Sequence, residues 1–133
     1  MKTITFAPEH PIVFVCDYDS SEVEIPEYDP DSVVSVCETC LSIRTIADVD
    51  GDVTITLSNT TPESIRKAYQ EVFSGQIQIF GSEIAVVNSA NERLLAIAMV
   101  GPMVRISVFV DDNVHPEKVW VEAQDVEELR HLM

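Results

Sequence analysis

The chain has 133 residues, and its 23 acidic side chains against 8 Lys and Arg give a net charge of −15. This excess excludes nucleic acid and anionic membrane surfaces as binding partners, because both are bound through lysine and arginine. Hydrophobic residues make up 46% of the chain, which is the level of an ordinary globular protein and argues against disorder. The length fits one domain, so a single domain over residues 1–133 is expected.

The sequence shows no signal for membrane insertion or export. No apolar run approaches the roughly 20 residues of a membrane-spanning helix. The apolar stretch of a signal peptide is missing near the start, since Pro8, Glu9 and His10 interrupt the chain there. Three cysteines cannot all pair within one chain, and reduced thiols are the default without export. We therefore expect a cytoplasmic protein.

The first half of the chain contains three stretches of strand character. Residues 11–18 form a nearly continuous apolar run of strand length, as in a central strand. Residues 40–47 and 52–58 alternate between apolar and polar side chains, which is the period of a half-buried strand. Gly51 lies between the last two runs and can supply the positive φ of a tight turn, so a hairpin is predicted there.

One segment has the period of a helix instead. Residues 62–73 place apolar side chains on one helical face, with Thr61 as the expected N-cap and Pro62 at the first helical position. We expect a short crossover helix over about 62–73 that covers a sheet edge or the open end of a sandwich.

Strand patterns resume after this helix, at 76–80, 83–88, 93–99, 103–111 and 118–123, separated by turn-forming residues. Their spacing of about ten residues suits an antiparallel arrangement. The last residues, 125–133, are expected to add a short C-terminal helix, with Asp125 at its start. The predicted fold is mainly β: an antiparallel β-sandwich of about seven to nine strands.

The charge is concentrated in the first half of the chain. Residues 17–52 contain eleven acids and one base, Arg44, and so carry −10 of the net charge. Two tyrosines lie among these acids, and tyrosines rimmed by charge are typical of binding hot spots. A tyrosine half-buried at a strand end is the equally weighted alternative. The predicted partner-binding residues are Asp17, Tyr18, Asp19, Glu22, Glu24, Glu27, Tyr28, Asp29 and Asp31.

Two motifs suggest chemistry, and each has a simpler interpretation. Cys37 and Cys40 have zinc-ligand spacing, but a site would have to recruit Cys16 and one of His10, His115 or His131; small buried side chains are the favoured interpretation. Residues 48–52 are rich in Asp but depart from the EF-hand pattern, and a β-turn is favoured. No catalytic triad or nucleotide-binding motif is present. No catalytic residue, cofactor or metal site is predicted.

From about Cys40 to Ala123, the order of elements resembles the competence protein J family. The matching pieces are LSIRT, VTITLS, AYQEVFSG, QIQIF, EIAVV, ERLLAIAMVGPMVRISVFV and EKVWVEA. The chain departs from relatives at Met103 and Val104, where they often have tyrosine. The resemblance implies a small inhibitor of a nuclease involved in DNA entry, and it carries over no catalytic residue.

The sequence therefore predicts an acidic inhibitor or immunity-type protein that masks a basic, nuclease-like partner protein. Two other classes stay open: a structural subunit that forms homo-oligomers through sheet edges, and an unrecognised enzyme or metal-binding protein.

Overall fold

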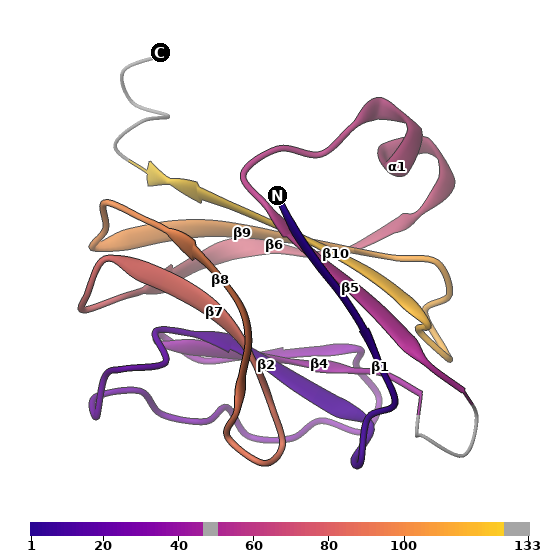
Figure 1. The fold of residues 1–133 in the computed structure, drawn as a ribbon, viewed down its shortest axis with the longest axis horizontal. Helices are drawn as coiled ribbons and strands as arrows, with labels where there is room; N and C mark the ends of the chain where they lie inside the picture. Colours follow the sequence, from indigo (N-terminus) through magenta and orange to yellow (C-terminus); the bar gives the residue numbers. More distant parts are fainter. Residues whose placement is uncertain (47–50, 127–133) are drawn as a thin grey trace.

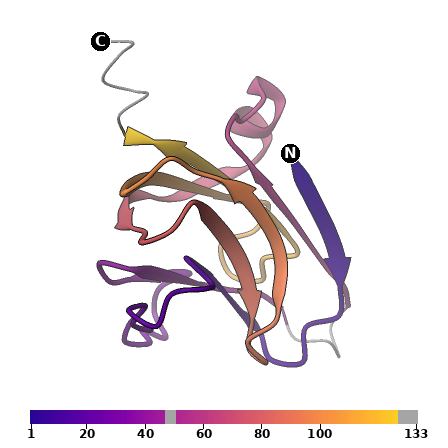
Figure 2. The ribbon, with the colours of Figure 1, turned by 60° about the vertical axis from the view of Figure 1, so that its left-hand side comes forward.

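A computed structural model describes residues 1–46 and 51–126, and it shows two five-stranded sheets packed face to face (Figures 1 and 2). The first sheet has the order β1-β5-β10-β9-β6, and the second has the order β3-β4-β2-β7-β8. The elements are β1 (Lys2–Phe6), β2 (Ile12–Cys16), β3 (Val34–Val36), β4 (Cys40–Arg44), β5 (Val53–Ser58), α1 (Glu63–Ala68), β6 (Gln70–Gln78), β7 (Glu83–Asn88), β8 (Arg93–Ala98), β9 (Met103–Val110) and β10 (Lys118–Asp125).

This arrangement confirms the predicted mainly-β sandwich. Neighbouring strands are antiparallel except for β5 and β10, which run parallel. The described residues hold ten strands, a little above the expected seven to nine. β1 and β3 are the two that the sequence did not reveal: β1 is five residues long, and β3 has only three, inside a segment with no run of alternation.

The core lies between the sheets and is filled by every second residue of each strand. In β2 the inward residues are Val13 and Val15, and in β4 they are Leu41 and Ile43; all four are fully buried. Because side chains alternate along a strand, Phe14 and Cys16 face the other way, toward the outer face of the second sheet. That outer face carries the site described below.

The predicted hairpin around Gly51 is wrong. β4 pairs with β2 and β3, whereas β5 pairs with β1 and β10, so the chain changes sheets between them. Local alternation identifies strands but not their partners, which are set by contacts distant in sequence. Residues 47–50, including most of the Asp-rich motif, lie outside the described residues, as does most of the predicted C-terminal helix at 125–133.

The crossover helix is shorter than predicted. α1 begins after Pro62, which occupies the N-cap position without a side-chain hydrogen bond, and it ends at Ala68. Thr61 donates its hydroxyl to Glu122 instead of capping the helix. Val72 and Phe73, assigned to the helical face, belong to β6 and pack against the core. Pairing of β6 with β9 overrides the local helical pattern.

α1 and the residues before it cover the outer face of the first sheet. The guanidinium of Arg66 lies 5.4 Å from the centre of the Phe109 ring and bonds to the Glu122 carboxylate at 2.9 Å. Trp120, on the same face, donates its indole N–H to the carbonyl of Thr60 at 3.1 Å. Among the described residues, no helix is long and apolar enough to cross a membrane.

Candidate partner-binding surface

The predicted binding residues lie on a segment that crosses the outer face of the second sheet. We call residues 17–31, between β2 and β3, the acidic segment. Beneath it is a second, small apolar cluster made by outward residues of β2, β4 and β7, including Cys16, Cys40 and Val87. Tyr18 and Val23 of the acidic segment pack against this cluster. The segment is therefore attached to the sheet by apolar contacts, despite its charge.

Hydrogen bonds fix the path of its backbone. The Glu24 N–H donates to the hydroxyl of Thr39 at 2.9 Å, and the thiol of Cys37 donates to the carbonyl of Glu24 at 3.2 Å. Further along, the Arg44 guanidinium donates to the carbonyl of Pro30 at 2.8 Å. These bonds come from the β3–β4 turn and from β4, so the sheet itself shapes the exposed surface of the segment.

Asp17 differs from the other predicted binding residues. It is only 4% exposed, and its Oδ2 accepts hydrogen bonds from the N–H groups of Phe80 at 2.8 Å and Gly81 at 2.7 Å. This carboxylate holds the turn between β6 and β7 and does not face solvent. We therefore leave it out of the exposed binding surface, although the sequence placed it there.

The remaining acids of the segment are exposed and lie close together along the chain: Asp19, Glu22, Glu24, Glu27, Asp29 and Asp31. The ion pairs found in the described residues are Arg66–Glu122 and Arg93–Glu83, and neither involves this segment. Among these acids stand two exposed apolar side chains, Ile25 at 62% and Tyr28 at 59% exposure. Carboxylates and apolar groups thus share one surface, which we call the acidic surface.

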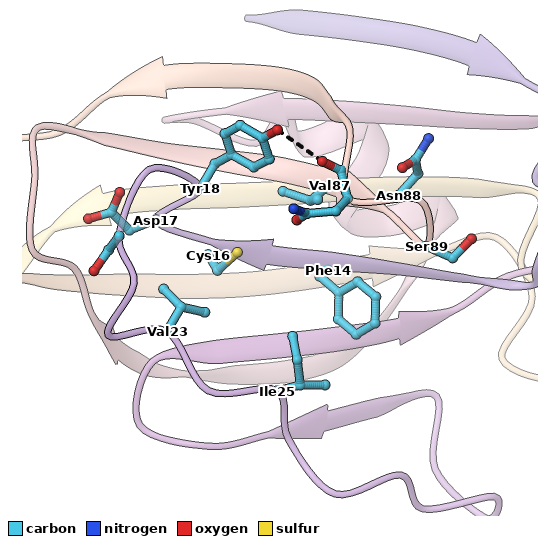
Figure 3. Close-up of a pocket in the computed structure, with 11 residues that line it drawn as sticks. Phe14, Cys16, Asp17, Tyr18, Val23, Ile25, Val87, Asn88 and Ser89 are labelled. Atoms are coloured by element: carbon cyan, nitrogen blue, oxygen red, sulfur yellow. Dashed lines mark hydrogen bonds between the residues drawn. The ribbon is translucent and has the colours of Figure 1, made fainter.

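A pocket of about 420 Å³ opens between the acidic segment and the sheet (Figure 3). Phe14, Cys16 and Val87 come from the sheet, while Val23 and Ile25 come from the segment. Tyr18 also lines the pocket, and its hydroxyl donates a hydrogen bond to the carbonyl of Asn91 at 2.9 Å (Figure 3). Tyr18 is thus half-buried at the end of β2, as the alternative interpretation of this tyrosine expected. The pocket can hold an apolar side chain beside exposed carboxylates.

A second pocket, of about 590 Å³, is lined in part by Tyr28. Its lining includes Ile12, Ile46 and the exposed Val114. Val114 is held by Asp112, whose Oδ1 accepts hydrogen bonds from the N–H groups of Val114 at 2.8 Å and His115 at 3.1 Å. These hydrogen bonds lower the pKa of Asp112 below its ordinary value. Tyr28 therefore stands beside an open, largely apolar hollow.

Sequence reasoning missed part of this surface. Val114 is distant from the acidic segment in sequence, and Ile12 begins the strand that precedes the segment, so nothing local places either beside Tyr28. Ile25 could have been noticed, because it alternates with charged residues within residues 22–27 and is one of the few large apolar side chains in the segment.

The candidate zinc ligands do not form a site within the described residues, where no group of three or more His, Cys, Asp or Glu is placed to hold a metal. Cys40 is buried, as expected, whereas Cys37 is partly exposed. His10 and His115 are exposed, and His131 lies outside the described residues.

No family model, curated protein or solved structure matches this chain.

Proposed function

We propose that this chain is a protein-binding domain that uses the acidic surface to contact a basic region of a partner protein. One observation carries the proposal: Ile25 and Tyr28 are exposed among carboxylates that form no ion pair in the described part of the chain. Exposed large apolar side chains beside pockets supply binding energy. The surrounding carboxylates supply orientation and speed of encounter.

Preorganisation adds support. The acidic segment is held by Thr39, Cys37 and Arg44, so binding would cost little ordering of its backbone. The negative electrostatic potential of such a fixed surface accelerates association with a positively charged partner.

The kind of partner is a further part of the proposal. Carboxylates can take the place of DNA phosphates in a basic groove, so a nuclease masked by this domain fits the charge. This is also what the resemblance to the competence protein J family implies. The proposed setting is the cytoplasm, where an inhibitor would protect the cell's own DNA.

Self-assembly through sheet edges has less support. The edges are β1 and β6 in one sheet and β3 and β8 in the other. β3 has three residues, and β6 is interrupted by a bulge between Glu71 and Phe73. Short strands and bulges are features that keep edges from pairing with other chains.

A pair of charge-matched variants tests the proposal. The first neutralises the acidic surface: Glu22→Gln, Glu24→Gln, Glu27→Gln and Asp29→Asn. The second removes four exposed charges elsewhere: Glu9→Gln, Glu63→Gln, Glu71→Gln and Glu117→Gln. Each is immobilised and exposed to a lysate of the cells that make the protein, and retained proteins are identified by mass spectrometry. We expect the native chain and the second variant to retain the same basic protein, and the first variant to lose it. Equal retention by both variants would contradict the proposal.

A further inference from the structure

The three cysteines form a row across β2, β4 and the residue that follows β3. Cys16 of β2 lies directly opposite Cys40 of β4. On the other side of β4, Val36 pairs with Leu41, and the next position in that register sets Cys37 opposite Cys40, with the Cys37 N–H donating to the Cys40 carbonyl at 2.9 Å. Directly opposed residues point to the same face of a sheet. The three thiols therefore share the outer face, beneath and beside the acidic segment, and all three are free.

Cys16 and Cys37, the two cross-strand neighbours of Cys40, pair with it in different geometries. Thr45 donates its N–H to the carbonyl of Pro11, so the pair 11/45 is hydrogen-bonded. Hydrogen-bonded and non-hydrogen-bonded pairs alternate in an antiparallel ladder. The β2–β4 register runs without a shift, which makes Cys16 and Cys40 a non-hydrogen-bonded pair. In such pairs the Cα atoms are about 4.5 Å apart and the side chains are closest.

That spacing suits a disulfide, which needs Cα atoms about 4.4–6.8 Å apart and Cβ atoms about 3.5–4.5 Å apart. Cys37 and Cys40 form a hydrogen-bonded pair, in which the side chains are farther from each other. Of the two pairings open to Cys40, the geometry favours the one with Cys16.

The two thiols also differ in character. A hydrogen bond from Cys40 lowers the pKa of Cys16, against the opposing effects of burial and of Asp17. The same hydrogen bond and burial raise the pKa of Cys40. The thiolate is the reactive form of cysteine. Cys16 is 6% exposed and lines the 420 Å³ pocket (Figure 3). Cys40 is fully buried and does not line the pocket.

We propose that Cys16 and Cys40 are a reversible redox pair, oxidised to a cross-strand disulfide by a peroxide that reaches Cys16 through the pocket. The Cys16 thiolate attacks one oxygen of hydrogen peroxide, the O–O bond breaks, and the released hydroxide takes up a proton to leave as water. Cys16 is then a sulfenic acid. The sulfur of Cys40 attacks the sulfur of Cys16, the S–O bond breaks, and the Cys40 proton leaves with the hydroxyl group as a second water. A dithiol reductant reverses the bond by exchange.

The position of this bond has a structural consequence. The loop that it closes contains residues 17–39, and so the whole acidic segment. A cross-link restricts the unfolded chain and clamps both ends of the loop. Oxidation is therefore expected to raise the midpoint of thermal unfolding. This inference does not depend on the identity or existence of a partner protein.

Peptide mapping tests the pairing directly. The full chain is treated with hydrogen peroxide, the remaining thiols are alkylated, and the product is cut with an endopeptidase specific for glutamate. Cleavage after Glu22, Glu27 and Glu38 places the three cysteines in three separate peptides. We expect a Cys16–Cys40 linkage in the native chain and in Cys37→Ser, its loss in Cys16→Ser and Cys40→Ser, and full reversal by dithiothreitol.

Three results would overturn the inference. One is a dominant Cys37–Cys40 linkage in the folded native chain. Another is irreversible oxidation of Cys16 without a disulfide. The third is disulfide formation no faster in the folded chain than in urea. Because the native chain and Cys37→Ser decide these outcomes, the test holds even where the Cys16 or Cys40 variants do not fold.

Discussion

The N–H of Gly81 donates a hydrogen bond of 2.7 Å to the carboxylate of Asp17, tying the start of the acidic segment to the turn between β6 and β7. The Phe80 N–H bonds to the same oxygen. Asp17→Ala leaves both donors without this acceptor, so we expect the free energy of unfolding to fall by about 2–3 kcal/mol. Urea denaturation measures this change. Asp19→Ala, at an exposed position, is the control and should change stability by less than about 0.5 kcal/mol. Equal losses in the two variants would show that the carboxylate of Asp17 has no structural role.

The role of Asp17 illustrates what a sequence cannot reveal. Its partner Phe80 is 63 residues further along the chain, and nothing near Asp17 separates it from the exposed acids that follow. Alternation did locate most strands well: the bounds of β7 match the predicted 83–88, because turn residues flank it on both sides. The acids at 19–31 and Tyr28 are exposed, as the binding interpretation requires, whereas Tyr18 follows the half-buried alternative that carried equal weight.

The errors arose where distant contacts decide the structure. The sequence predicts a helix over the first part of β6 because its apolar residues fit both periods, and the pairing with β9 decides between them. The parallel pairing of β5 with β10 replaced a hairpin that local turn chemistry favoured. The pocket beside Tyr28 joins residues from both ends of the chain, so no local pattern could indicate it.

Arg66 offers a test of the outer face of the first sheet. Glu122 is buried, and its carboxylate is bonded by Arg66 and by the hydroxyl of Thr61. Arg66→Met keeps much of the contact with Phe109 but leaves the carboxylate without its cation. Arg66 is itself partly exposed, which limits the loss, and we expect a decrease in stability of about 1–2 kcal/mol. Restoration of stability by adding Glu122→Gln would confirm that the unpaired charge is the cause; a further loss of the same size would contradict it.

The apolar side chains of the acidic surface should matter for binding but not for folding. Ile25→Ser and Tyr28→Ser each remove an exposed anchor, and we expect the dissociation constant of the partner complex to rise about tenfold or more. Thermal unfolding should be unchanged. Val100→Ser is the matched control, since Val100 is also highly exposed but lies on the β8–β9 turn. Isothermal calorimetry provides the measurement, and an equal loss of affinity in the control would contradict the assignment.

Asp112 gives the fold a local dependence on pH. Its pKa is lowered by the N–H groups of Val114 and His115. A carboxyl with a lowered pKa in the folded state stabilises that state above its ordinary pKa of about 4, and this contribution disappears as pH falls through the lower folded value. Asp112→Asn keeps an acceptor but does not titrate. The stability advantage of the native chain over this variant should therefore shrink between about pH 5 and pH 2. An NMR titration that places the Asp112 carboxyl at or above its ordinary pKa would contradict this account.

The central claim is that the acidic surface guides a basic partner protein to this domain. The most direct test is the association rate constant of that partner, measured by stopped-flow at several salt concentrations. For the native chain and for the variant neutralised at Glu9, Glu63, Glu71 and Glu117, we predict fast association that slows steeply as salt rises. For the variant neutralised at Glu22, Glu24, Glu27 and Asp29, we predict slow association with little dependence on salt. The same salt dependence in all three proteins would contradict the claim.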